Sequence, residues 1–91
     1  MALCMYFPVK GMTVARYEGV LRDLEAAGQG APAGRSYHCA FFAGDDLHVV
    51  DVWDSQEAFD AFGEVLIPIL TANGVEPAQP EAGEVHNIIA G

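Results

Sequence analysis

The chain has 91 residues, of which 52% are hydrophobic, and its formal net charge is −9. This length fits one small domain over residues 1–91, with a core that is marginal by itself. With only four lysines and arginines, the chain has no basic surface for nucleic acid, and an anionic membrane surface is an equally poor partner.

The chain start is apolar, but it lacks the basic region that opens a signal peptide. No apolar run approaches the roughly 20 residues of a membrane span, so we expect a cytoplasmic protein. Cys4 and Cys39 lie far apart in predicted strands, which favours free buried thiols in a reducing compartment over a disulfide.

The first half of the chain predicts a strand, a helix and a loop. Residues 2–9 form an apolar strand. Thr13 is the candidate N-cap of a helix over residues 14–27, in which apolar side chains recur at helical spacing: Val14, Tyr17, Val20, Leu21 and Leu24. Gly28 ends this helix, and a glycine-rich loop follows it.

Residues 35–54 predict a β-hairpin with arms rich in β-branched and aromatic residues, joined by a Gly-Asp-Asp turn. If the turn is the two residues Gly44-Asp45, His38 faces Asp51 and Ser36 faces Trp53. The face of His38 and Asp51 then carries an ionisable pair in apolar surroundings, which suggests a lined cavity. We expect the helices to cover the other face, with Tyr37, Cys39, Phe41, His48, Val50 and Val52.

A second helix begins after this hairpin. Asp54 as N-cap with Glu57 three residues on is a pair like a capping box, and Ser55 is the alternative cap. An apolar stripe follows, but Pro68 falls inside it, removes one backbone donor and clashes with the carbonyl of Glu64. We therefore predict a kink near residues 64–67.

Residues 75–81 predict a loop and residues 84–90 the last strand. The resulting order, βαββαβ, is the ferredoxin-like α+β arrangement: an antiparallel sheet with strand order 4-1-3-2 and both helices on one face. Two helices cover only one face of a sheet that is apolar on both. We therefore expect an obligate homodimer.

The run Val52–Phe59 (VWDSQEAF) closely resembles the strand-to-helix junction of the antibiotic-biosynthesis-monooxygenase-like family, in the dimeric α+β barrel superfamily. In that family a tryptophan ends the third strand and Ser-x-Glu-Ala opens the second helix. The resemblance implies a homodimer in which two sheets close face to face. It also implies a range of activities, including cofactor-free oxidation of polyketide phenols, haem breakdown, quinol handling and polyketide cyclisation, among which a fold alone does not choose.

The pair His38–Asp51 is the candidate catalytic site, because a carboxylate orients an imidazole ring and makes it a better general base. The alternative is a structural hydrogen-bonded pair in a dimer interface. Candidates for substrate binding are aromatic and polar side chains that sheet positions could direct into a pocket: Trp53, Phe42, Tyr6 and His86. Aromatic residues at alternating strand positions also fit a plain core.

We expect neither a metal nor an organic cofactor. The three histidines show no close-set ligand spacing, and strand four lies roughly 10 Å from strand three in the usual sheet order. The chain has no phosphate loop, nucleophile motif or flavin or nicotinamide fingerprint. For haem breakdown, His86 or Asn87 is the available iron ligand.

The expected function is a small-molecule enzyme similar to cofactor-independent monooxygenases, acting on a hydrophobic, phenolic or polyketide-like compound. A polyketide cyclase using the same base is one alternative. A non-enzymatic dimer that binds an apolar ligand, or serves in assembly or stress, is another.

Overall fold

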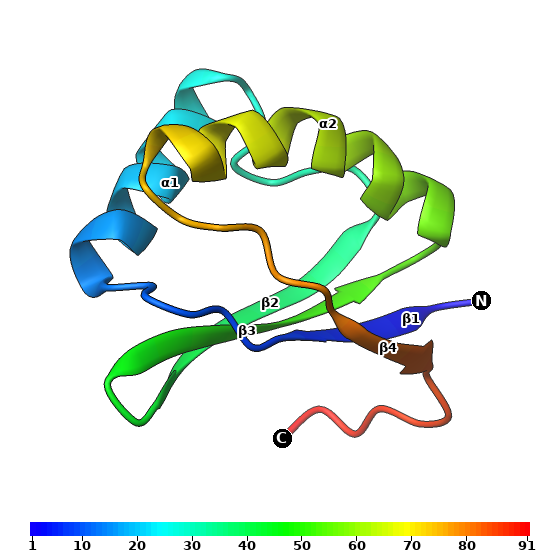
Figure 1. The fold of residues 1–91 in the computed structure, drawn as a ribbon. Helices are drawn as coiled ribbons and strands as arrows, with labels where there is room; N and C mark the ends of the chain where they lie inside the picture. Colours follow the sequence, from blue (N-terminus) through cyan, green and yellow to red (C-terminus); the bar gives the residue numbers. More distant parts are fainter.

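A computed structural model describes residues 1–91 of the chain. Its elements are β1 (Leu3–Phe7), α1 (Val14–Ala26), β2 (Arg35–Ala43), β3 (Asp46–Trp53), α2 (Gln56–Ala72) and β4 (Glu81–Glu84). The strands form one antiparallel sheet in the order β2-β3-β1-β4, and both helices lie over the same face of it (Figure 1). The predicted ferredoxin-like α+β fold is confirmed. Neither helix is long and apolar enough to cross a membrane.

Each helix begins at a side chain that accepts a hydrogen bond from the first turn. The Thr13 hydroxyl accepts from the amide of Arg16 at 3.2 Å, as predicted. The Ser55 hydroxyl accepts from the amide of Ala58 at 3.1 Å, so the cap of α2 is Ser55 and the preferred prediction of Asp54 was wrong. The strand β3 ends at Trp53, and Asp54 belongs to the connection between the two elements.

The predicted kink at Pro68 was wrong, because α2 is helical without a break from Gln56 to Ala72. A proline inside a helix costs about 3 kcal/mol and one hydrogen bond. Tertiary packing offsets that cost here: Leu66, Ile69 and Leu70, on either side of the proline, pack against the buried core. Burial of the apolar stripe therefore stabilises the helix by more than the proline destabilises it.

The hairpin has the predicted register, with His38 opposite Asp51 and Ala43 opposite Asp46. Gly44 is the first residue of the two-residue turn, and its φ of 68° lies in the region that glycine adopts without strain. At the open end, the register shifts between Arg35 and Tyr37. This β-bulge places Arg35 opposite Trp53, where Ser36 was expected.

The last strand lies earlier than predicted, at Glu81–Glu84 instead of residues 84–90. Glu84 pairs with Leu3, the first residue of β1, and the amide of Val85 donates to the carbonyl of Ala2 at 2.9 Å. A strand can pair only as far as its partner extends, so the apolar residues beyond Val85 have no strand beside them. The prediction failed because it used composition and ignored the length of β1.

The helices cover the face opposite to the one predicted. His38, Asp51 and Trp53 point toward α1 and α2, while Tyr37 and Phe41 lie on the outer face, defined here as the side of the sheet away from the helices. Alternation could not decide this, since both faces of the hairpin are apolar. The choice follows the bulkiest side chains, because Trp53 and Met5 are fully buried beneath the helices.

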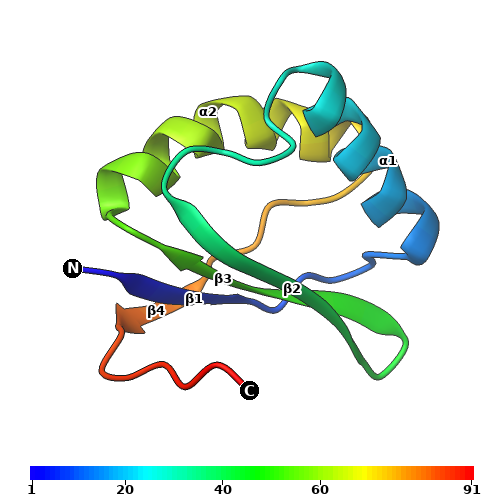
Figure 2. The same ribbon diagram turned by 180° about the vertical axis from the view of Figure 1, so that it is seen from behind.

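The outer face has no helix on it, and the residues after β4 run along that side of the sheet (Figure 2). Both cysteines are free thiols. Cys39 is half-buried, and Cys4 is exposed where a buried thiol was expected. Cys4 pairs with Val52 and Cys39 with Val50, so β3 separates them.

Candidate functional site

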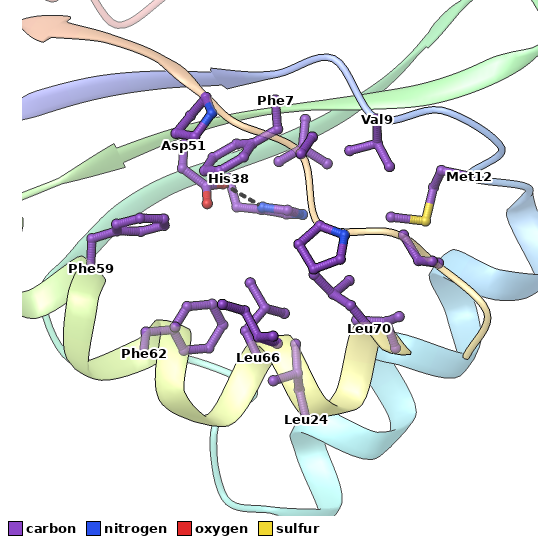
Figure 3. Close-up of a pocket in the computed structure, with 18 of the residues that line it drawn as sticks. Phe7, Val9, Met12, Leu24, His38, Asp51, Phe59, Phe62, Leu66 and Leu70 are labelled. Atoms are coloured by element: carbon purple, nitrogen blue, oxygen red, sulfur yellow. Dashed lines mark hydrogen bonds and ion pairs between the residues drawn. The ribbon is translucent and has the colours of Figure 1, made fainter. Parts of the chain in front are cut away.

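A cavity of about 730 Å³ lies between the helix-covered face of the sheet and the two helices. Such a volume is in the usual range for small-molecule sites. Its lining is mainly apolar and comes largely from both helices, from β1 and from the segments that follow β1 and α2. It includes Phe7, Val9, Met12, Leu24, Phe59, Phe62, Leu66 and Leu70 (Figure 3). Most of its wall can therefore hold only an apolar ligand surface.

His38 and Asp51 extend from neighbouring strands into this cavity (Figure 3). The imidazole Nδ1 lies 2.6 Å from Asp51 Oδ1, so the predicted contact is confirmed. The Asp51 side chain is only 8% exposed, against 22% for His38. The histidine is therefore the member of the pair that a ligand can reach, with the carboxylate behind it.

Trp53 fixes the second oxygen of the carboxylate. Its indole Nε1 donates to Asp51 Oδ2 over 3.3 Å, which is possible because residues two apart on a strand share a face. Trp53 is fully buried against Phe59 and Phe62 and does not line the cavity. The structure thus places it as a support for Asp51, whereas the sequence suggested that it packs a substrate.

Tyr17 completes the group, although sequence reasoning assigned it only to the apolar stripe of the first helix. Its hydroxyl oxygen lies 2.7 Å from His38 Nε2, and the two rings are nearly parallel. Tyr17 also lines the cavity. A usable signal existed, because a tyrosine on the buried side of a helix needs a partner for its hydroxyl.

The hydrogen-bond partners determine which groups carry protons. An ionised Asp51 only accepts, so the proton is assigned to His38 Nδ1, and in the neutral ring Nε2 then accepts from the Tyr17 hydroxyl. Burial raises the pKa of Tyr17 above its usual value of 10.0, although the nearby Arg35 charge acts in the opposite direction. Tyr17 therefore keeps its proton at neutral pH and can donate it in a hydrogen bond to His38 Nε2.

The other predicted substrate-binding residues do not line this cavity. Tyr6 lies on the outer face, where its hydroxyl is 2.7 Å from His48 Nδ1. Phe42 is 67% exposed near the hairpin turn, and His86 is exposed in the segment after β4. Tyr6, Phe42 and His86 could contact a substrate only if the cavity lay beside other parts of the sheet. No three histidine, cysteine or acidic side chains cluster closely enough to hold a metal ion.

Comparisons with known proteins identify the fold. No protein-family model matches the chain, and no curated protein sequence matches it significantly. A protein of unknown function from Nitrosomonas europaea superimposes with a TM-score of 0.63 at 22% identity, over 99% of this chain and 94% of the other. SnoaB, a cofactor-independent oxygenase from Streptomyces nogalater, superimposes with a TM-score of 0.62 at 19% identity, over 97% and 94%. At these identities the chain shares a whole-length fold with both proteins.

Proposed function

We propose that this protein is a small-molecule enzyme of the cofactor-independent monooxygenase type, with His38 as its general base. The observation that carries the proposal is the chain Tyr17–His38–Asp51, which brings one histidine nitrogen into a mainly apolar cavity. The fold shared with SnoaB and the VWDSQEAF junction, which resembles the antibiotic-biosynthesis-monooxygenase-like family, both support it. The substrate class that fits is a hydrophobic phenolic or polyketide-like compound with an acidic hydroxyl or C–H group.

In the proposed reaction, the acidic group of the substrate replaces Tyr17 at His38 Nε2 and gives up its proton there. Asp51 stabilises the imidazolium, and the displaced Tyr17 hydroxyl donates to the new oxyanion. The electron-rich anion then reduces oxygen by itself, forming a carbon–oxygen bond and a peroxide. The His38 imidazolium returns its proton to the peroxide. Loss of the proton on that carbon then breaks the O–O bond, which leaves a ketone and expels hydroxide, and the hydroxide takes up the released proton to form water.

Anthrone is a suitable test compound, because its anion reacts in this way with a simple balance. One anthrone and one O₂ give one anthraquinone and one water. The experiment measures oxygen uptake and anthraquinone absorbance with the purified protein, with and without His38→Ala. Catalysed uptake that depends on His38 supports the proposal. Binding of anthrone without any catalysed uptake would instead support a non-enzymatic ligand-binding module.

We also propose a second copy of this chain as the partner that covers the outer face. Tyr37 and Phe41 are exposed there, and Phe41 lies next to the hydrogen-bonded Tyr6 and His48. The cavity opens on the other side of the sheet, so a dimer formed through this face leaves the site free. Light scattering tests the dimer, and a stable monomer at micromolar concentration would contradict it.

A further inference from the structure

Arg35 stands apart from the other cationic side chains. Lys10, Arg16 and Arg22 are exposed, whereas Arg35 is half-buried and lines the cavity beside the Tyr17–His38–Asp51 group. In a chain of net charge −9, it is the one positive charge directed at the candidate site. Its presence in a mainly apolar lining therefore needs a reason.

The β-bulge at Ser36 directs Arg35 toward the cavity. Residues three apart on a regular strand point to opposite faces, so without the bulge Arg35 and His38 would lie on opposite sides of the sheet. The register shift sets Arg35 opposite Trp53 and His38 opposite Asp51, two residues apart on β3 and on the same face. Bulges of this kind often re-aim a side chain beside an active site.

The guanidinium group of Arg35 has unused hydrogen-bonding capacity. The ion pair in the structure joins His38 to Asp51, and no carboxylate pairs with Arg35. Its one hydrogen bond is a long contact of 3.4 Å to the carbonyl of Gly30, and its carbon lies 5.8 Å from the centre of the Phe62 ring. An arginine offers five N–H donors in a planar fork, so most of them remain available to a ligand.

We propose that Arg35 is an anion-binding residue that holds a carboxylate of an aromatic ligand while the ring system occupies the apolar cavity. A planar guanidinium fork matches a carboxylate through two parallel hydrogen bonds. The β3 partners of Arg35 and His38, Trp53 and Asp51, are two positions apart. We therefore expect the bound carboxylate roughly 7 Å along the strand from the histidine. This inference deepens the proposed function by naming an acidic group on the substrate, distinct from the group that His38 deprotonates.

The other charged residues that line the cavity besides His38 are acidic: Asp51, Asp60, Glu64 and Glu76. The surrounding negative charge disfavours anions in general, so one cation inside the site selects a ligand by the position of its charge. A neutral amide of the same shape can accept one hydrogen bond from Arg35, but it lacks the charge and the second acceptor oxygen, so it gains less. The structure therefore predicts discrimination between a carboxylate and its uncharged amide.

The test compares two fluorescent probes, anthracene-9-carboxylate and anthracene-9-carboxamide, by titration into the intact protein at neutral pH. Hydrogen bonds to a charged group contribute about 1.5–3 kcal/mol, so the carboxylate should bind about 10- to 100-fold more tightly. Arg35→Gln should remove this preference, because it should weaken binding of the carboxylate far more than binding of the carboxamide. Arg35→Lys keeps the charge but loses the fork, and its preference should lie between the two.

Arg22→Gln is the matched control, because it removes the same charge from an exposed site on α1. Equal affinities in the unmodified protein, a preference that survives Arg35→Gln, or an equal loss in Arg22→Gln would each overturn the proposal. So would failure of both probes to bind at millimolar concentration. Retained carboxamide binding shows that the Arg35→Gln cavity is folded. Neither titration involves turnover, and anthrone has no carboxylate, so failure here is distinguishable from failure of the oxygenase activity.

Discussion

The two faces of the sheet carry the same pair of side chains in different settings. On the helix-covered face, the Tyr17 hydroxyl is hydrogen-bonded to His38 Nε2 over 2.7 Å. On the outer face, the Tyr6 hydroxyl is hydrogen-bonded to His48 Nδ1 over 2.7 Å. The other ring nitrogen of His38, Nδ1, is hydrogen-bonded to the buried Asp51, whereas no protein group forms a hydrogen bond with the second ring nitrogen of His48. A tyrosine–histidine contact is therefore not enough to define a site; the buried carboxylate and the cavity distinguish the inner pair.

The two histidines differ in how firmly their rings are oriented. Asp51 accepts from both His38 and Trp53, so each of its oxygens has a fixed donor and the imidazole is held in one tautomer. Nothing equivalent holds His48, which packs among aromatic rings. We expect the inner pair to affect chemistry and the outer pair to affect assembly.

The largest expected effect is loss of activity when the inner histidine is removed. His38→Ala should lower the rate of anthrone oxidation by about 10²–10⁴-fold, the usual contribution of one general base. His48→Ala deletes the matching ring from the outer face and should change the rate little. Oxygen uptake measures both, and equal losses in the two variants would erase the proposed distinction between the faces.

A sharper test removes the carboxylate and keeps the ring. Asp51→Asn preserves the shape of the side chain but lets it donate as well as accept, so His38 Nδ1 loses its fixed role as donor. The ring ¹⁵N chemical shifts of His38 should move from one tautomer toward a mixture, and the oxidation rate should fall by no more than in His38→Ala. An unchanged tautomer would show that Asp51 does not orient the base.

The next effect concerns assembly through the outer face. Tyr37 is 57% exposed there, and Tyr37→Asp would bury an unpaired charge in the proposed dimer at a cost of about 3–5 kcal/mol. The matched control is Phe42→Asp, which changes an equally accessible aromatic of the same hairpin on the other face. Sedimentation should detect monomers only for Tyr37→Asp. Dimers that persist in that variant would place the interface elsewhere.

A smaller effect is expected from the inner hydroxyl. Tyr17→Phe removes the donor to the substrate oxyanion, a charged hydrogen bond worth about 1.5–3 kcal/mol, so the rate should fall about 10- to 100-fold. Tyr6→Phe removes the equivalent hydroxyl from the outer face and should leave the rate near that of the unmodified protein. Steady-state oxidation of anthrone compares the two, and a faster Tyr17→Phe enzyme would mean that Tyr17 only blocks the base.

The smallest effect appears as a pH dependence of stability. Burial raises the pKa of Tyr17 in the folded state, so the folded protein holds this proton more tightly than the unfolded chain. That contribution to stability is complete below about pH 10, the unfolded pKa, and is lost as the pH rises through the folded pKa. Urea unfolding between neutral and alkaline pH should therefore show a steeper loss for the unmodified protein than for Tyr17→Phe. Parallel curves would contradict a buried, protonated Tyr17.

The usual topology of a βαββαβ chain supplied the sheet order. The residue pattern alone determined the order of the elements and the facing of His38 and Asp51. These features follow from local rules: turn chemistry at Gly44 sets the hairpin register, and apolar spacing sets the helices. The residue pattern allowed either Asp54 or Ser55 as the N-cap of α2, and the structure shows that the cap is Ser55.

Only the tertiary structure decided which face the helices cover, and with it the composition of the site. Both faces of the hairpin are apolar, so the choice depends on how Trp53 and Met5 pack against elements distant in the sequence. Tyr17 joins His38 from a helix 21 residues away, and a bulge that no spacing rule foretold directs Arg35 to the same cavity. Such contacts depend on how separate elements pack in three dimensions, which local periodicity does not encode.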